Sequence, residues 1–310
     1  MTFLYIIIAL VLIFDFINGF HDSANSIATI VSTKVLSPFN AVLLAAILNF
    51  IAFTVFPLKV ATTMGKGVID PAVVTLTVIA AALIAAITWD LLTWWWGLPS
   101  SSSHTLVGGL VGAAIVSSGP GSIITGGVLK IAAFIVIAPL LGMVMSYIIS
   151  ILVINLVKKH SPSGIDKHFR RLQLLSAAAF SLGHGGNDAQ KSMGIIWIAL
   201  ITMGVASVDD KRPELWVVLS CQAAIALGTL FGGWRIVKTM GQRITKLRPF
   251  EGFCAEAAGA LTLFGATHFG IPVSTTHTIT GSIMGVGAIK GFSAVKWGVT
   301  TKIFWAWILT

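Results

Sequence analysis

A short polar stretch interrupts the first apolar run of the chain, and it contains residue types that bind ions. Residues 19–26, Gly-Phe-His-Asp-Ser-Ala-Asn-Ser, follow an almost continuous run of Ile, Leu, Val and Phe. A charged group at membrane depth costs about 2.5–3.5 kcal/mol on insertion scales, so Asp22 is costly in a helix that only crosses lipid. Residues 185–192, Gly-Gly-Asn-Asp-Ala-Gln-Lys-Ser, repeat this pattern. The repetition predicts two broken helices, near residues 18–22 and 183–188, around one central site.

A second pair of motifs is rich in hydroxyl groups. Residues 98–105 read Leu-Pro-Ser-Ser-Ser-Ser-His-Thr, and residues 271–278 read Ile-Pro-Val-Ser-Thr-Thr-His-Thr. Pro suits the first turn of a helix and Ser or Thr suits its N-cap, so each motif predicts a helix N-terminus. The unpaired amides and positive dipole end of such a terminus, lined with hydroxyl donors, form an anion site. The glycine pairs 108/112 and 281/285 predict tight re-entrant hairpins, whose tips we expect to meet at mid-membrane.

The composition indicates that the elements holding these motifs are membrane-spanning helices. Of the 310 residues, 56% are hydrophobic and 10% are charged. Soluble domains carry about 25% charged residues. The apolar runs also reach the length of about 20 residues that a spanning helix needs. We therefore expect an all-α polytopic membrane protein with broken helices and re-entrant helical hairpins.

The distribution of charge predicts two inverted repeats. Residues 158–171 and 235–248 are rich in Lys and Arg, and cytoplasmic loops carry such an excess. The counterpart of the second loop in the first half, residues 59–71, holds only two Lys and one Asp, so we expect it outside. The first transmembrane repeat would then be 1–157, followed by the basic cytoplasmic linker 158–171 and a second repeat at 172–310.

Other features narrow the function. The formal net charge is +9, but the charges lie in short loops between apolar spans, which indicates contact with anionic lipid and not with nucleic acid. The two cysteines lie inside apolar spans and are expected to be packing residues. The sequence has no Gly-x-x-x-x-Gly-Lys-Ser/Thr loop, so ATP is not expected to drive it. The chain stops in apolar sequence at residues 305–310, and we expect the last span to be truncated.

Taken together, the four motifs resemble those of the PiT family of inorganic phosphate transporters. Asn-Gly-Phe-His-Asp-Ser-Ala-Asn at 18–25, Gly-His-Gly-Gly-Asn-Asp-Ala-Gln-Lys at 183–191 and the two Pro/Ser/Thr-His-Thr hairpins occur in the family's order over nearly the whole chain. The resemblance implies a phosphate symporter of two inverted repeats, multi-pass in the cell (inner or plasma) membrane, and a homodimer. Its partners would be inorganic phosphate and membrane lipid, and it would be neither an enzyme nor a carrier of a bound cofactor.

The resemblance also implies roles for the residues that match the family's motifs. The positions expected to bind phosphate are Asn25, Ser101, Ser102, Ser103, Thr105, Asn187, Ser274, Thr275 and Thr276. The positions expected to couple transport to a cation or a proton are Asp22, Asp188, Lys191, Glu256, His104 and His277. No resident metal and no catalytic residue is expected.

Lys191 is the position that bears on the coupling ion. Sodium-coupled members of the family carry Asn there, as this chain does at Asn25, the counterpart in the first half. Bacterial low-affinity members, thought to be proton-coupled, resemble this chain in having Gln-Lys. An ammonium fixed beside Asp188 would pair with it and repel sodium. We therefore expect phosphate import by symport with protons, with Mg²⁺ as a candidate companion of the phosphate, and sodium-coupled symport as the alternative.

Two other classes of function remain open from the residues alone. Asp22 and Asp188 in broken helices fit a cation antiporter, which would explain the carboxylates but not the hydroxyl-rich hairpins. Ser, His and Asp inside a membrane also fit an intramembrane hydrolase. A catalytic triad, however, uses one nucleophile, one base and one orienting group. Here the groups occur in duplicate and the sequence has no Gly-x-Ser-x-Gly elbow.

Overall fold

The apolar runs of the chain fold into helices, because a helix satisfies its backbone polar groups within its own segment, which lipid cannot do. The computed structural model describes residues 1–159, 161–207 and 209–310. Within these ranges three single helices are long and apolar enough to span a membrane, and two bent helix pairs raise the number to as many as five. The expected all-α polytopic membrane protein is confirmed.

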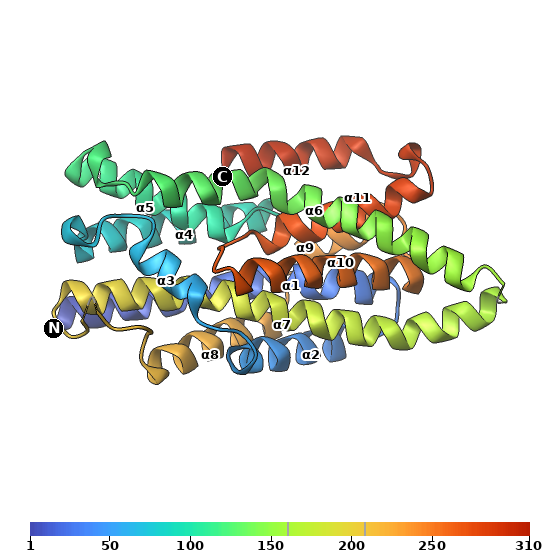
Figure 1. Ribbon diagram of the computed structural model, residues 1–310, viewed down its shortest axis with the longest axis horizontal. Helices are drawn as coiled ribbons and strands as arrows, with labels where there is room; N and C mark the ends of the chain where they lie inside the picture. The colour runs from blue at the N-terminus through green and yellow to red at the C-terminus, as the bar shows by residue number, and fades with distance from the viewer. Residues whose placement is uncertain (160, 208) are drawn as a thin grey trace.

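The helices fall into two successive halves (Figure 1). The first half holds α1 (Thr2–Ser32), α2 (Pro38–Ile51), η1 (Ala52–Thr54), α3 (Lys59–Lys66), η2 (Pro71–Val73), α4 (Leu76–Trp96), α5 (Ser102–Ser118), η3 (Pro120–Ser122) and α6 (Thr125–Val157). The second half holds α7 (Pro162–Thr202), α8 (Leu215–Phe231), α9 (Trp234–Lys238), η4 (Thr239–Arg243), α10 (Pro249–His268), α11 (Thr275–Ile289), η5 (Phe292–Ala294) and α12 (Trp297–Leu309).

Equivalent helices of the two halves run in opposite directions. In Figure 1, α1 runs away from the end that holds the N-terminus, and α7 runs back toward it. The α4–α5 hairpin enters from the N-terminal end and the α10–α11 hairpin from the opposite end. Their tips meet near the middle, where Ser103 Oγ donates a hydrogen bond to the Val273 carbonyl at 3.2 Å. The inverted arrangement and the meeting of the two hairpin tips agree with the prediction.

The helices are broken at other places than the sequence predicted. The stretches 19–26 and 185–192 lie inside the continuous helices α1 and α7, so the breaks expected near residues 18–22 and 183–188 are wrong. The structure instead bends by 81° between α2–η1 and α3, and by 60° between α8 and α9–η4. The polar side chains of α1 and α7 form hydrogen bonds with other helices. The backbone of α1 and of α7 therefore stays helical through the polar stretches.

The glycines of the polar stretches explain why the sequence looked like a helix break. A Cβ on Gly19 would lie 2.1 Å from the carbonyl oxygen of Ile225 on α8. A Cβ on Gly185 would lie 2.5 Å from the Cα of Asn49 on α2. Small residues at a helix interface let two backbones approach this closely. Gly19 and Gly185 therefore pack α1 and α7 against helices of the other half.

The expected linker 158–171 is only partly a connection between helices. The helix α6 ends at Val157, and Ser161 caps the start of α7 by accepting a hydrogen bond from the Gly164 amide at 3.3 Å. Residues 162–171 therefore form the first turns of α7. At 1.5 Å per residue, α6 is about 50 Å long, and it crosses the molecule from one end to the other (Figure 1).

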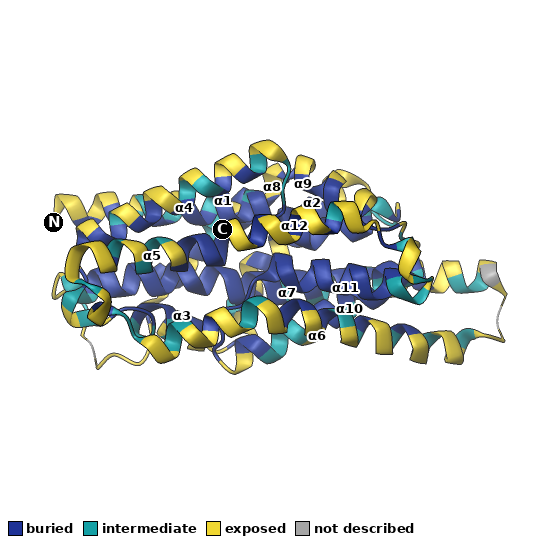
Figure 2. Cartoon of the chain, turned by 90° about the horizontal axis from the view of Figure 1, so that it is seen from above, coloured by how far each residue is buried: buried dark blue, intermediate teal, exposed yellow. Residues whose placement is uncertain are grey.

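Polar residues are gathered inside the bundle, and large apolar side chains cover its outside. Residues 21–30 of α1, 183–200 of α7 and 275–287 of α11 are all buried, and Figure 2 shows the buried parts of α7 and α11 at the centre of the molecule. The outward faces of α6 and α12 expose Leu, Ile, Val and Trp side chains. An apolar exterior faces lipid, so the buried polar residues mark the interior as the place of function.

Candidate anion-binding site

The tip of each hairpin is the N-terminus of a helix. Ser101 caps α5, since its side chain accepts a hydrogen bond from the His104 amide at 3.3 Å. Ser274 caps α11 in the same way, with the His277 amide at 3.1 Å. The first amides of a helix have no partner within it, and the helix dipole is positive at this end. Because the two tips meet, two such termini converge on one buried place, as an anion site requires.

The helix α1 joins this place through Asp22 and Asn25. Asn25 Nδ2 donates to Thr275 Oγ1 at 3.1 Å and to Thr276 Oγ1 at 2.9 Å. Thr276 Oγ1 in turn donates to Asp22 Oδ1 at 3.4 Å. His21 Nδ1 lies 2.7 Å from the same carboxylate oxygen. The first polar stretch thus contacts the hairpin tip of the second half.

The helix α7 joins the site through Asp188 and Lys191. The Lys191 ammonium donates to Asp188 Oδ1, to Ser103 Oγ and, at 2.8 Å, to the Val273 carbonyl. Thr275 Oγ1 donates to Asp188 Oδ2 at 2.9 Å. One fully buried ammonium therefore binds α7 to both hairpin tips at once.

Asn187 holds the second tip in position. Its side-chain amide donates to Thr267 Oγ1 at 3.0 Å and to the Ile271 carbonyl at 3.1 Å. Its carbonyl oxygen accepts from the Val273 amide at 3.2 Å. These bonds connect α7 to the end of α10 and to the loop before α11. Asn187 therefore fixes the conformation of the second hairpin tip.

Asp22 and Asp188 lie close together, as the paired motifs predicted. One ligand atom from each of Asp22, His184 and Asp188 lies within 4.8 Å of the other two. His184 Nε2 is 3.1 Å from Asp188 Oδ2, and its Nδ1 is 3.1 Å from Asn49 Oδ1. His184 and Asn49 were not among the expected site residues. The spacing of four residues between His184 and Asp188, one helical turn, is the signal in the sequence that identifies the histidine.

The two hairpin histidines face each other across the meeting of the tips. The ring centroids of His104 and His277 are 4.7 Å apart, and His277 stacks on Trp307 at 3.8 Å. His277 Nδ1 lies 3.4 Å from the Ile135 carbonyl. Among the described residues, His104 Nδ1 and His277 Nε2 have no hydrogen-bond partner. One polar atom of each ring is therefore able to bind a small solute or to exchange a proton.

Ser102 presents a further polar atom at the tip of the first hairpin. Its side chain is buried near the carboxylate of Asp90, and its hydroxyl makes no hydrogen bond of normal geometry in the part of the chain that the structure describes. Among the described residues, the side-chain oxygen of Asn25 makes no such bond either. Most buried polar groups in proteins are paired, so such exceptions call for an explanation. A bound anion at the tips would supply the partner of the Ser102 hydroxyl.

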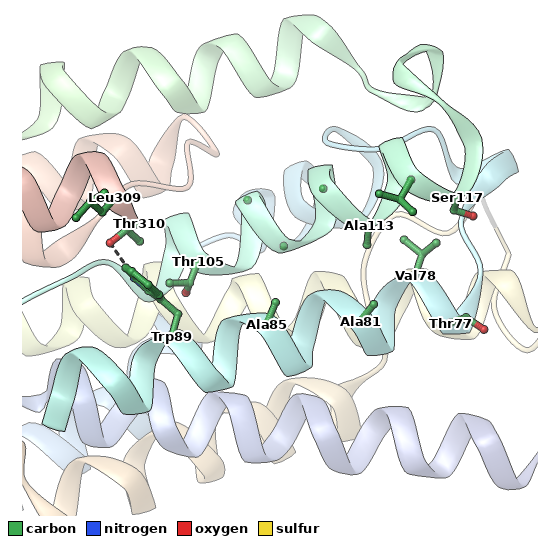
Figure 3. A pocket seen from close by; sticks show the side chains of 14 residues that line it. Thr77, Val78, Ala81, Ala85, Trp89, Thr105, Ala113, Ser117, Leu309 and Thr310 are labelled. Carbon is green, nitrogen blue, oxygen red and sulfur yellow. Dashed lines mark hydrogen bonds between the residues drawn. The ribbon is translucent and has the colours of Figure 1, made fainter.

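The side chain of Thr105 lies away from the other residues expected to bind phosphate. Within the described residues its hydroxyl donates to Asp90 Oδ1 at 3.2 Å and to the carbonyl of Ser102. Thr105 lines a groove of about 680 Å³ between α4 and α5, next to the end of α12 (Figure 3). Its expected contact with phosphate therefore finds no support in the geometry.

Of the two glycine pairs, only Gly281 and Gly285 in the second half make a close helix contact. That contact is with α6, and not with the other helix of their own hairpin. A Cβ on Gly281 would lie 2.1 Å from the Pro139 carbonyl oxygen, so α11 packs tightly on α6 and not within its own hairpin. Gly108 and Gly112 line the groove of Figure 3. A Cβ on Gly112 would have no described neighbour within 4 Å.

Glu256 also lies apart from Asp22 and Asp188. Its carboxylate accepts hydrogen bonds from Thr29 at 2.5 Å, Gln173 at 3.0 Å and Ser176 at 2.6 Å. Thr29 follows Asp22 by seven residues, which is about 10 Å along α1. Glu256 thus belongs to a separate, fully hydrogen-bonded cluster that joins α1, α7 and α10.

An apolar exterior, two inverted halves and a buried central cluster of charged and hydroxyl groups define this chain as an integral membrane transporter. A family model described as the phosphate transporter family matches residues 18–310. The chain therefore belongs to the phosphate transporter family, and the resemblance seen in its motifs is confirmed. The family and its members are transporters and not enzymes, and the chain is a multi-pass protein of the plasma membrane.

Several known proteins are similar to the chain over nearly its whole length. A protein of Rhizobium meliloti named probable low-affinity inorganic phosphate transporter is 58% identical over 304 residues, which are 98% of this chain and 91% of that protein. A protein of Bacillus subtilis with the same name is 45% identical over 100% of this chain and 92% of its own. A solved structure called the sodium-dependent phosphate transporter has a TM-score of 0.90 at 26% identity, covering 100% of this chain and 95% of that one.

Proposed function

We propose that this protein imports inorganic phosphate by symport with protons, and that phosphate binds where the two hairpin tips meet α1 and α7. The observation that carries the proposal is the position of Lys191. Its ammonium lies in the middle of the cluster and binds Asp188, Ser103 and the Val273 carbonyl. A resident cation at this place leaves sodium little electrostatic advantage there.

The donors of the site suit a tetrahedral oxyanion. The N-termini of α5 and α11 supply backbone amides, and Ser102, Thr275 and Thr276 supply hydroxyl groups. Thr275 and Thr276 bond Asp188, Asp22 and Asn25 in this structure, so these bonds must be exchanged for bonds to phosphate when it enters. Charge-assisted hydrogen bonds to phosphate are stronger than those between neutral groups, which favours the exchange.

The acidic side chains of the cluster explain why a proton or a cation must bind together with the phosphate anion. Asp22 and Asp188 are both acidic side chains; His21 pairs with Asp22, and the Lys191 ammonium pairs with Asp188. A phosphate anion added to a buried site of this kind is disfavoured by like-charge repulsion unless a proton or cation binds as well. The binding of the anion and of its companion are thus coupled through one cluster.

In this proposal, the positive charge that binds together with phosphate can also be a divalent metal ion. Asp22, His184 and Asp188 offer one ligand atom each within 4.8 Å of one another. Carboxylate oxygens suit Mg²⁺, and the added imidazole suits transition metals. Because Lys191 repels a free cation, the metal ion in this proposal arrives already paired with phosphate, as neutral cargo that the three ligands and the hairpin tips hold together.

Transport of radiolabelled phosphate into proteoliposomes tests the proposal. Uptake should follow an inward proton gradient in the absence of sodium, compete with arsenate, and change when Mg²⁺ is removed. Uptake that stops without sodium would reject proton coupling, and a lack of any phosphate uptake would reject the substrate. We also propose that the protein is a homodimer, which chemical cross-linking in the membrane and the mass of the purified protein would show.

A further inference from the structure

Asp15 is a buried carboxylate that the proposed phosphate site does not use. It lies on α1, seven residues before Asp22, and is 0% exposed. Neither of its carboxylate oxygens makes a hydrogen bond of normal geometry among the described residues, although the side chains of Ser192 and Asn18 lie within reach of it. Asp188, Glu256 and Asp22 are buried too, but each of them accepts hydrogen bonds. Asp15 is therefore unlike the other acidic groups of the interior.

Three helices surround Asp15 with polar groups that are also unpartnered. Asn18 on α1 and Ser192 on α7 are neighbours of the carboxylate, and so is Cys221 on α8. Within the described residues, the side-chain oxygen of Asn18 and the hydroxyl of Ser192 have no hydrogen-bond partner by normal geometric criteria. The side chains of Asn18, Ser192 and Cys221 are all buried. Several unpaired polar groups in one interior place indicate a site that binds something.

The charged and titratable groups that face Asp15 belong to α7 and α8. Asp188 and Lys191 of α7 interact with it electrostatically, and Cys221 of α8 lies beside it. An ionised carboxylate without a partner is strongly disfavoured in a buried place, whereas a carboxylic acid is not. Asp188 adds like-charge repulsion, and the ammonium of Lys191 is already bound by Asp188, Ser103 and the Val273 carbonyl.

We propose that Asp15 is the group that binds the co-transported proton. The inference rests on the proposed proton symport and names the residue that carries the proton. One proton from outside forms an O–H bond with a carboxylate oxygen of Asp15, and the same proton leaves to the cytoplasm after the phosphate. No other bond is formed or broken.

Lys191 connects this proton to the phosphate site. With Asp15 neutral, the Lys191 ammonium remains with Asp188 and with both hairpin tips, as it does in this structure. With Asp15 ionised, the negative charge attracts the ammonium away from Ser103 and Val273, and the tips lose the group that joins them to α7. A neutral Asp15 therefore keeps the tips in the arrangement that binds and releases phosphate, and deprotonation after the phosphate has left prevents it from binding again.

The Asp15→Asn variant tests the proposal, because an amide resembles the neutral acid but binds no proton. Two assays in proteoliposomes are compared: exchange of radiolabelled phosphate at equal concentration and pH on both sides, and accumulation driven by an inward proton gradient. We expect the variant to exchange phosphate within about twofold of the unmodified protein and to lose the stimulation by the gradient. Asp15→Glu should restore part of the stimulation. The matched control is Asp90→Asn, since Asp90 is equally buried but bonds Thr105.

Each outcome decides between explanations. Gradient-driven accumulation by Asp15→Asn equal to that of the unmodified protein would overturn the assignment. So would loss of the gradient response in Asp90→Asn but not in Asp15→Asn, or sodium-stimulated exchange that Asp15→Asn abolishes. Loss of exchange by Asp15→Asn together with Asp15→Glu, in protein that elutes normally on size exclusion, would also count against it. If the unmodified protein takes up no phosphate, the failure lies with the proposed function and not with Asp15.

Discussion

Replacing Lys191 by Met should destabilise the fold and remove transport, because it leaves the buried carboxylate of Asp188 without its cation. Breaking one partner of a buried ion pair costs about 3–5 kcal/mol. Asp188 keeps its contacts with Thr275 and His184, so we expect the lower end, about 3 kcal/mol. At about 2–4 °C per kcal/mol, the midpoint of thermal unfolding should fall by roughly 6–12 °C.

The assay is thermal unfolding of the purified protein in detergent, followed by tryptophan fluorescence. The matched control is Lys290→Met, which removes another ion pair, between Lys290 and Glu251 at 2.6 Å, where Lys290 is 33% exposed. Glu251 is buried but keeps its hydrogen bond from the Arg248 amide, and the partly exposed Lys290 is screened by solvent, so this variant should cost about 1 kcal/mol or less and change the midpoint by less than about 4 °C.

The double variant Lys191→Met/Asp188→Asn separates stability from function. It removes both charges, so most of the lost stability should return, although phosphate uptake should not. Equal unfolding midpoints for Lys191→Met and Lys290→Met would refute the reasoning. A double variant less stable than Lys191→Met would show that the pair is not what holds α7 to the tips.

Three further predictions concern the carboxylate, the hydroxyl groups and the helix contacts of the site. Asp22→Asn should abolish phosphate uptake without unfolding the protein, and near-normal uptake would contradict its role. Ser102→Ala removes a hydroxyl that makes no hydrogen bond of normal geometry to a described residue, so KM for phosphate should rise about 5–10-fold while the unfolding midpoint remains the same. Ser101→Ala removes a helix cap and should instead cost about 1 kcal/mol of stability. Gly281→Ala places a Cβ 2.1 Å from a backbone oxygen and should cost at least about 1–3 kcal/mol, whereas Gly112→Ala, with open space around it, should be close to neutral in the same melting experiment.

The hairpin tips could be predicted from the sequence because their signals are local. The order Pro, hydroxyl group, His, Thr places a cap and a first turn within a few residues, and Ser101 and Ser274 form these caps. The pairing of Lys191 with Asp188 is also local, since three residues separate the two on one helix. The inverted arrangement followed from the repetition of the motifs and from the positions of the basic residues.

The continuity of α1 and α7 could not be predicted, because a helix break and a close helix contact use the same residues. Gly19 beside Asp22 fits either, and the Ile225 backbone that decides between them lies far away in the sequence. The bonds of Asn25 to Thr275 and of Lys191 to Ser103 also depend on how the two halves interleave. Thr105 and Glu256 were expected in the site on the basis of motif position alone, and the contacts they make lie elsewhere.

The most direct test of phosphate binding at the hairpin tips is the rate at which a cysteine at position 102 is modified. The Ser102→Cys variant is treated with a small charged thiol reagent in membranes, and Ser117→Cys, at the exposed end of α5, is the control. The account predicts that phosphate slows modification at position 102 in proportion to its occupancy, that sulfate at equal ionic strength has a weaker effect, and that position 117 is unaffected. Equal rates at position 102 with and without saturating phosphate would contradict it.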